Sequence, residues 1–417
     1  MELNLVEQLG VKAKEVQPVL ACADTMQKNE ALKAIAKALV ERTSEIIEAN
    51  NVDILSAEKN GMSKSMIDRL ALTEARIKSI ADACLDIVKL DDPVGVIDSG
   101  VVRPNGLRIV KTRVPLGVVG MIYEARPNVT VDAAALCIKS GNVAILRGGK
   151  EAFNSNKCLT AIIRDALESV GLPADCVALV ESTTRESATQ MMKCSKYIDV
   201  LIPRGGAGLI STVVENSTVP VIETGTGNCH VYVDSTADLK MAVDIVHNGK
   251  TSRPSVCNAV ETCLVHKAVA EEFLPMLKKA LDSHNVEIRG CELTKMILGD
   301  CVVEATIKDY ETEFLDYILA VKVVDNTYEA IDHIRQYSTG HSECIVTESL
   351  LAAEQFQKQI DSAAVYVNAS TRFTDGGEFG LGAEIGISTQ KLHARGPLGL
   401  NELTSMKFLI NGSGQIR

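Results

Sequence analysis

The chain lacks several features that would assign it to a specialised class of protein. It has no tryptophan, and none of its 12 cysteines form a C-x-x-C pair. Its seven histidines show neither H-x-x-x-H nor H-E-x-x-H spacing. We therefore expect no structural or catalytic metal. An apolar run of about 18 residues is also missing, so we expect no membrane-spanning helix.

The chain also lacks an excess of positive charge. Its 54 acidic residues outnumber its 43 lysines and arginines, which gives a formal net charge of −11. This balance argues against a nucleic-acid binder. Residues 1–7 are acidic and lack the basic start and apolar core of a signal peptide. Twelve scattered cysteines without such a leader favour a reducing compartment, so we expect a cytoplasmic protein.

What is present is the composition of an ordinary globular protein. The 417 residues are 46% hydrophobic and 23% charged, enough for two or three domains. The first hundred residues read as helical. An amphipathic stripe predicts one helix near residues 32–40, formed by Leu32, Ile35, Ala36, Leu39 and Val40. Another helix is expected at 74–90, with Thr73 as its N-cap.

Beyond residue 115, short apolar runs alternate with helical patterns. This alternation predicts parallel sheets covered on both faces, joined by right-handed crossovers. The expected strands are 117–122, 143–146, 177–180, 199–202, 230–234, 259–265, 320–324, 344–346 and 364–367. The expected helices are 131–140, 156–170, 237–247 and 268–282.

Two further strands are expected outside the parallel sheets, at residues 108–114 and 405–410. Residues 108–114 mix charged and apolar side chains in near alternation, which is typical of a half-exposed strand. Such a strand can serve an oligomer contact or be a simple edge hairpin, and the pattern does not separate the two.

A dinucleotide fingerprint of the form G-x-G-x-x-G after the first strand is absent. Two other β–α turns could hold a dinucleotide. Arg147 and Lys150 follow the second strand, where NAD-specific sites commonly have an acidic residue, so two cations there favour the 2′-phosphate of NADP. A solvated turn is the alternative. Gly205 and Gly206 follow the fourth strand and would let backbone amides approach a phosphate.

Cys257 is the candidate nucleophile. Arg253 precedes it by four residues and Lys250 by seven, and nearby cations favour the reactive thiolate. Most free cysteines are small buried residues of the hydrophobic core. The residues next to Cys257 do not by themselves separate a catalytic cysteine from a core cysteine.

Four motifs together resemble the aldehyde dehydrogenase superfamily, and most closely its glutamate-5-semialdehyde dehydrogenase branch. They are YEARPNVT at 123–130, IETGTGNCH at 222–230, RPSVCNA at 253–259 and GAEIGISTQKLHARGP at 382–397. The resemblance spans essentially the whole chain.

The resemblance implies a role for each matching residue. Cys257 matches the nucleophile, Asn128 an oxyanion-hole donor, and Glu223 the general base of hydrolytic members. The implied cofactor residues are Arg147, Lys150, Gly205, Gly206 and Glu384. The implied substrate residues are Arg126, Arg253, Ser370, Thr371 and Arg372.

One departure from the hydrolytic members indicates the substrate. Those members have a Trp-Asn pair before the oxyanion asparagine, whereas here Arg126 and Pro127 precede Asn128. Arginine beside the acyl site suits an anionic substrate or a phosphate leaving group, although Arg126 and Arg253 could instead be structural ion-pair partners.

The resemblance also implies an α/β fold of two doubly wound parallel-sheet domains with a small β oligomerisation element. We expect an NADP-binding domain at 1–107 and 124–228 and a catalytic cysteine domain at 229–370. Oligomerisation strands and a closing segment are expected at 108–123 and 371–417.

The implied activity is NADPH-dependent reduction of L-glutamyl 5-phosphate to L-glutamate 5-semialdehyde through a thioacyl intermediate, the second step of proline biosynthesis from glutamate. A hydrolytic NAD(P)-dependent aldehyde dehydrogenase and a non-catalytic cofactor-binding scaffold are the alternatives. A homo-oligomer is expected, and the glutamate 5-kinase that supplies the substrate is a possible partner.

Overall fold

The computed structural model describes residues 3–417, which form two compact units. Unit 1 comprises Met1–Thr224, Gly380–Gly386 and Leu398–Arg417. Unit 2 comprises Gly225–Phe379 and Ile387–Pro397. The C-terminal part of the chain therefore contributes residues to both units.

Five helices precede the first strand: α1 (Leu5–Cys22), α2 (Thr25–Glu41), α3 (Thr43–Lys59), α4 (Lys64–Leu70) and α5 (Glu74–Lys89). The predicted N-cap is confirmed, since Thr73 accepts a hydrogen bond from the Arg76 amide at the start of α5. The predicted stripe of α2 is buried from residue 32 to residue 39. Val40, at the edge of that stripe, is exposed.

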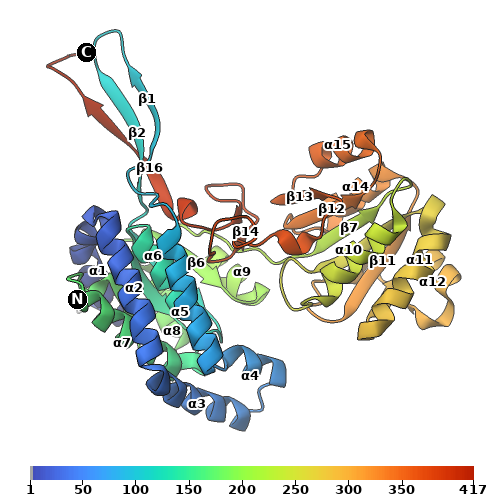
Figure 1. The fold of residues 1–417 in the computed structure, drawn as a ribbon, viewed down its shortest axis with the longest axis horizontal. Coiled ribbons are helices and arrows are strands. Elements are labelled where there is room, and N and C mark those ends of the chain that lie inside the picture. The colour runs from blue at the N-terminus through green and yellow to red at the C-terminus, as the bar shows by residue number, and fades with distance from the viewer. Residues whose placement is uncertain (1–2) are drawn as a thin grey trace. The chain divides into compact units, whose positions relative to one another are not determined.

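A four-stranded parallel sheet forms the centre of unit 1, in the order β5-β4-β3-β6. β3, which lies in the range 108–123 that we assigned to the oligomerisation strands, pairs here with both β4 and β6. α1 packs against β4 and α7 against β5, and the helices α2 and α5 lie side by side (Figure 1). The elements are β3 (Val118–Tyr123), α6 (Asn128–Lys139), β4 (Val143–Arg147), η1 (Lys150–Ala152), α7 (Phe153–Ser169), η2 (Ala174–Cys176), β5 (Val177–Leu179), α8 (Arg185–Lys193), β6 (Val200–Arg204) and α9 (Ala207–Asn216).

A separate antiparallel sheet in unit 1 joins the two predicted outer strands. β2 (Arg108–Pro115) pairs with β1 (Ile97–Val102) on one side and β16 (Thr404–Asn411) on the other. A 3-10 turn, η6 (Asn401–Leu403), leads into β16. β1 had no alternating pattern in the sequence, because all six of its residues are exposed.

Unit 2 is built on a seven-stranded parallel sheet in the order β10-β9-β11-β8-β7-β12-β13. The strands are β7 (Cys229–Val233), β8 (Val260–His266), β9 (Glu287–Gly290), β10 (Val303–Glu304), β11 (Ile318–Val324), β12 (Ser342–Val346) and β13 (Ala364–Val367). The helices are α10 (Leu239–Thr251), α11 (Lys267–Leu281), α12 (Glu292–Leu298), α13 (Ile307–Tyr310), α14 (Thr327–Tyr337) and α15 (Leu350–Gln359). Shorter pieces are η3 (Asp282–His284), η4 (Gly299–Cys301), η5 (Thr371–Phe373), β14 (Ile387–Ser388) and β15 (Gly396–Pro397).

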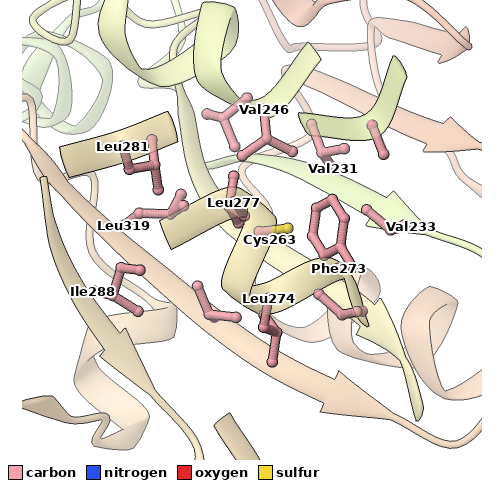
Figure 2. Close-up of a cluster of buried hydrophobic side chains, with 14 of the residues drawn as sticks. Val231, Val233, Val246, Cys263, Phe273, Leu274, Leu277, Leu281, Ile288 and Leu319 are labelled. Atoms are coloured by element: carbon pink, nitrogen blue, oxygen red, sulfur yellow. The ribbon is translucent and has the colours of Figure 1, made fainter. Parts of the chain in front are cut away.

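The central strands of this sheet are buried on both faces, and their sequences are accordingly rich in apolar residues. Alternate residues of a strand point to opposite faces. Val231 and Val233 of β7 pack with Phe273 and Leu277 of α11 (Figure 2). Tyr232, between the two valines, packs in a second cluster with the helices α14 and α15.

The predicted architecture of two parallel sheets covered by helices, with a small antiparallel element, is confirmed. Within residues 3–417, none of the helices is both long and apolar enough to span a bilayer.

Candidate active site

In the sheet of unit 1, β4 and β5 follow on one side of β3, and β6 lies on its other side. The chain therefore reverses its direction across the sheet between β3 and β6, and the carboxyl ends of these two parallel strands are neighbours. Tyr123, at the end of β3, pairs with Arg204, at the end of β6. Ligands of open parallel sheets bind outside the carboxyl ends of the strands at such a switch point. Arg126 and Asn128 follow β3, and the glycine pair at 205–206 follows β6. Four of the residues predicted from the sequence therefore belong to one edge of one sheet.

A small cavity of about 50 Å³ lies at this edge. Arg126, Asn128 and Glu384, three of the predicted residues, line it together with Asp132 and Arg204. The cavity thus combines two guanidinium groups, two carboxyl groups and one amide.

Tight packing holds the Glu384 segment beside β6. A side chain at Gly386 would bring its Cβ to 2.9 Å from Thr224 Cγ2 and 3.2 Å from Arg204 Nη1. Thr224 in turn donates from its hydroxyl to the Pro203 carbonyl at 2.7 Å. Glycine at position 386 therefore lets the C-terminal motif approach the switch point.

Glu223 belongs to the same edge. The segment before it runs beside β6: the Leu201 amide donates to the Pro220 carbonyl at 2.8 Å, and the Ile222 amide donates to the Leu201 carbonyl at 2.9 Å. Glu223 follows this pairing directly, one residue before Thr224. The pairing of residues 220–222 with β6 therefore fixes its position, and the sequence pattern did not indicate that pairing.

The predicted phosphate turn already binds an anion. The Gly206 amide, which precedes α9, donates to a carboxylate oxygen of Glu124 at 2.9 Å. A Cβ at Gly205 would lie 2.5 Å from the same oxygen. The N-terminal amides of a helix bind phosphate and carboxylate alike. The turn therefore suits an anionic group, and Glu124 would compete with an anionic ligand there.

Arg147 and Lys150 differ in their surroundings. Arg147 donates to the carbonyls of Thr183 and Thr184, at 2.8 and 3.0 Å. Its Nε is buried with no hydrogen-bond partner in the described part of the chain. Desolvation lowers the pKa of Arg147. Lys150 is exposed in η1. Arg147 is therefore partly committed to the loop before α8, and Lys150 is the more accessible cation.

In unit 2, a buried ion pair spans the loop that contains Cys257. Lys250, at the end of α10, contacts Glu261 of β8 at 2.5 Å, and both side chains are fully buried. Glu261 also accepts a hydrogen bond from the Leu315 amide at 3.2 Å. Burial raises the pKa of Glu261 to about 7 and lowers the pKa of Lys250. The charge of Lys250, which the sequence placed near the thiol, is balanced by Glu261.

Residues 227–229 pack directly on the backbone of Cys257. A Cβ at Gly227 would lie 1.4 Å from the Cys257 carbonyl oxygen, so only glycine fits there. The Cys229 thiol donates to the same oxygen at 3.2 Å. Burial raises the pKa of Cys229 well above its usual value, so it remains a neutral thiol. Cys257 is the more accessible of the two.

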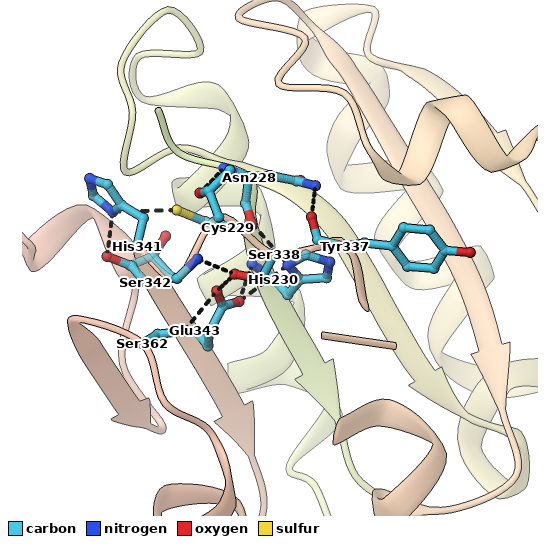
Figure 3. A network of polar contacts seen from close by, with 12 residues as sticks. Asn228, Cys229, His230, Tyr337, Ser338, His341, Ser342, Glu343 and Ser362 are labelled. Carbon is cyan, nitrogen blue, oxygen red and sulfur yellow. Dashed lines mark hydrogen bonds and ion pairs between the residues drawn. The ribbon is translucent and has the colours of Figure 1, made fainter. Parts of the chain in front are cut away.

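The segment behind this contact is fixed by a buried polar network (Figure 3). Asn228 donates to the carbonyls of Tyr310 and Tyr337, at 2.6 and 2.8 Å. The amide of His230 donates to the Glu343 carboxylate at 2.8 Å. These bonds set the path of residues 227–229 and, through them, the position of Cys257.

Three of the predicted substrate residues, Ser370, Thr371 and Arg372, lie beside the same loop. Ser370 donates to Asn248 at 2.8 Å, and Thr371 donates to the Asn258 carbonyl at 2.7 Å. Both hydroxyl hydrogens are therefore used within the fold. The Arg372 guanidinium donates to Ser252 and to the side chain of Asn258, on either side of Cys257 in the sequence.

Arg372 also brings positive charge to the thiol. Desolvation and the nearby charge of Arg253 lower the pKa of Arg372, while Asp375, Cys257 and Cys229 raise it. The interaction is mutual, so Arg372 favours the thiolate of Cys257.

The predicted site residues are divided between the two units. Unit 1 contains Arg126, Asn128, Arg147, Lys150, Gly205, Gly206, Glu223 and Glu384. Unit 2 contains Arg253, Cys257, Ser370, Thr371 and Arg372.

Sequence reasoning missed Asp132, although a signal existed. Asp132 follows Asn128 by four residues, a spacing that places two side chains on one face of a helix. The predicted helix began at residue 131, whereas α6 begins at Asn128.

The model of the aldehyde dehydrogenase family matches residues 4–298. The chain is 60% identical over 408 residues to γ-glutamyl phosphate reductase of Clostridium perfringens, covering 98% of each chain. It is 59% identical over 412 residues to that of Caldanaerobacter subterraneus, covering 99% of each.

Solved structures agree in fold. The crystal structure of γ-glutamyl phosphate reductase from Thermotoga maritima has a TM-score of 0.97 and 52% identity, covering 99% of this chain and 100% of that one. The enzyme of the same name from Saccharomyces cerevisiae has a TM-score of 0.56 and 29% identity, covering 100% and 99%.

The chain thus belongs to the aldehyde dehydrogenase family of oxidoreductases, and within it to the γ-glutamyl phosphate reductase branch. The family and branch that the four motifs suggested are confirmed.

The contribution of the buried ion pair to stability can be tested by replacing Lys250 and measuring the free energy of unfolding. Lys250→Met leaves the Glu261 carboxylate in the interior without its cation, and breaking such a pair costs about 3–5 kcal/mol. We expect this loss in the free energy of unfolding, measured by urea titration with circular dichroism at pH 8. Lys250 lowers the pKa of Glu261, so Glu261 protonates at a higher pH in Lys250→Met, and the loss becomes smaller as the pH falls.

A matched control lies on the same helix. Lys240 pairs with Asp244 at 3.4 Å on the exposed face of α10, and exposed pairs contribute about 0–1 kcal/mol. Lys240→Met should therefore change stability little. Equal losses for the two variants would contradict a structural role for the Lys250–Glu261 pair.

Proposed function

We propose that the protein reduces L-glutamyl 5-phosphate to L-glutamate 5-semialdehyde with NADPH and releases phosphate, as the second step of proline biosynthesis from glutamate. Relatives at 60 and 59% identity over their full length have the name of this activity. The main observation in support is the accessible Cys257 thiol, with the Arg372 guanidinium acting on it and Arg253 acting on Arg372. Such a group of charges favours a thiolate and an anionic leaving group.

The first step is attack of the Cys257 thiolate on the acyl carbon of the substrate. A carbon–sulfur bond forms and the carbon–oxygen bond to phosphate breaks, so phosphate leaves with the bonding electron pair. Arg253 and Arg126 are the proposed partners of the departing phosphate. Covalent capture divides one difficult step into two easier ones.

In the second step the thioester is reduced. The nicotinamide cofactor supplies the hydride that the acyl carbon accepts. The carbonyl oxygen becomes an oxyanion, for which the Asn128 side chain and the Cys257 amide are the proposed donors. Reformation of the carbonyl then expels the Cys257 thiolate and releases the aldehyde. Removing one donor of this kind typically slows a reaction by about 10² to 10³.

The cofactor site is proposed at the carboxyl edge of the unit 1 sheet. Lys150 and Arg147 would hold the 2′-phosphate of NADP, the turn at Gly205 and Gly206 the pyrophosphate, and Glu384 the nicotinamide ribose. Two cations and a helix N-terminus form a donor set that fits a phosphorylated dinucleotide. Unit 1 then serves as the cofactor domain and unit 2 as the cysteine domain.

Two assignments remain secondary parts of the proposal. Glu223 has no hydrolytic step to serve in this direction, and we assign it to deprotonation of Cys257. Arg372 is assigned to an anionic group of the substrate. Ser370 and Thr371, whose hydroxyls donate within the fold, would act by shaping the loop around Arg372.

The nucleophile and the phosphate are tested together in the reverse direction. With L-glutamate 5-semialdehyde and NADP, we expect NADPH to form only when inorganic phosphate is present, because phosphate must cleave the thioester. Cys257→Ser should lower this rate by about 10³-fold or more, since a hydroxyl is a far weaker nucleophile than a thiolate. The measurement is NADPH absorbance.

Cys301→Ser is the control, because Cys301 is an exposed thiol in η4. It should retain full activity. Formation of NADPH without phosphate would instead identify a hydrolytic aldehyde dehydrogenase. A fully active Cys257→Ser protein would refute the nucleophile.

Cofactor preference is best tested at Lys150. Arg147 also holds the Thr183 and Thr184 carbonyls, so its replacement disturbs the fold as well as the charge. Lys150→Glu should raise the KM for NADPH at least about tenfold more than the KM for NADH, because a hydrogen bond to a charged group contributes about 1.5–3 kcal/mol. Equal changes in both KM values would refute a 2′-phosphate contact at Lys150.

We further propose that the antiparallel sheet joins copies of the chain. β16 is an edge strand, and Phe408 and Ile410 on it are 61% and 59% exposed. An exposed apolar edge strand favours pairing with another chain. Phe408→Asp should reduce the molar mass measured by light scattering, whereas Ser405→Asp on the same strand should not. An unchanged mass for Phe408→Asp would contradict the proposal.

A further inference from the structure

Asp132 is a carboxyl group in the wall of the unit 1 cavity to which neither the motifs nor the proposed reaction assigns a role. It lies one helical turn after Asn128 in α6, and its Oδ2 accepts a hydrogen bond from Asn128 Nδ2 at 2.9 Å. Both side chains line the cavity with Arg126, Arg204 and Glu384. A potential oxyanion donor is therefore in direct contact with an acceptor that has no other known task.

The surroundings of Asp132 act on its protonation. Desolvation raises the pKa of Asp132 to about 6, against the opposing effects of the Asn128 hydrogen bond and the charge of Arg204. On another side lies Cys84 of α5, whose pKa is raised to about 12 by burial and by the charge of Asp132. Arg126 and Glu384 are the remaining charged groups around the cavity.

We propose that Asp132 is a positioning residue that orients the side-chain amide of Asn128 toward the reacting carbonyl oxygen. The proposal deepens the function given above and rests on Asn128 being an oxyanion donor. Asp132 itself need not touch the substrate.

The physical reason is the asymmetry of an amide. A carboxylate can only accept hydrogen bonds, whereas the amide of asparagine has an NH₂ donor at one end and an oxygen acceptor at the other. Asp132 therefore selects the rotamer in which the nitrogen faces it. One N–H bonds Asp132, and the second N–H of the same nitrogen remains available as a donor. Rotation by half a turn would present the amide oxygen, which repels an oxyanion.

The alternative is that the contact only supports the helix. Pairs at this spacing stabilise helices by small amounts without any effect on chemistry. The two roles differ in one respect: a positioning residue acts through Asn128 and has no effect on the reaction when Asn128 is absent.

A double-mutant cycle separates them. Asp132→Ala, Asn128→Ala and the double variant are assayed with L-glutamate 5-semialdehyde, NADP and phosphate. We expect kcat to fall about 10² to 10³-fold in Asn128→Ala, as for loss of an oxyanion donor. In Asp132→Ala it should fall about tenfold, as for loss of an orienting partner, with KM values unchanged. The double variant should match Asn128→Ala.

The conservative variant and the pH profile add a second readout. Asparagine at position 132 keeps an acceptor oxygen but can also donate, as the protonated carboxyl can, so Asp132→Asn should have a kcat between those of the parent protein and Asp132→Ala. In the parent protein the ionised carboxyl is the orienting form, so kcat should decline as pH falls through about 6. That decline should be absent in Asp132→Asn.

The outcomes are distinguishable. Suppose that Asn128→Ala lowers kcat and that the double variant loses kcat by the product of the two single losses. The positioning role is then refuted and the reaction scheme stands. A pH decline that persists in Asp132→Asn also counts against the role. If Asn128→Ala has full kcat, the oxyanion assignment itself fails, and the role of Asp132 with it.

Discussion

The buried contact between Lys250 and Glu261 is the constraint on which the geometry around Cys257 depends. The loop follows α10, which ends one residue after Lys250, and leads into β8, which begins one residue before Glu261. An ion pair with no solvent access therefore fixes both ends of the loop. Between them the Cys257 carbonyl is pressed against Gly227 so closely that no side chain fits. The nucleophile proposed at Cys257 must keep its position while the substrate reacts, and a loop held at both ends and along its back provides that rigidity.

The fold could be predicted from the sequence wherever burial imposed a pattern. β7 and β8 are buried on both faces and are rich in apolar residues, and Thr73 correctly predicted the start of α5. β1 could not be predicted, because an exposed outer strand needs no apolar alternation. The segment that pairs with β6 before Glu223 is fixed by its neighbour in space, which local sequence does not record.

For the site, the sequence motifs identified candidate residues but not the hydrogen bonds and ion pairs that these residues form. In the sequence, Ser370 and Thr371 look like hydroxyl donors available to a substrate. In the structure, Ser370 donates to Asn248 and Thr371 donates to the Asn258 carbonyl, both far away in the sequence. Lys250 looks like a cation beside the thiol, yet Glu261 neutralises it. In each case a partner more than ten residues away decides the chemistry. Asp132 is the converse: its partner is four residues away, and an error of three residues in the helix start concealed it.

The two units differ in how their charged residues are balanced. In unit 2, Arg372 and Arg253 lie near Cys257, and the buried Lys250 adds no charge because Glu261 cancels it. Asp375 offsets part of this positive charge, and the remainder favours a thiolate and a phosphate leaving group together. In unit 1, the guanidinium groups of the cavity are matched by carboxyl groups, so the cavity carries little net charge. In a nearly neutral, desolvated pocket the oxyanion donor proposed at Asn128 would act more strongly, because the guanidinium charges are offset by carboxyl groups. The orientation of Asn128 therefore matters more in this pocket than it would in a strongly positive one.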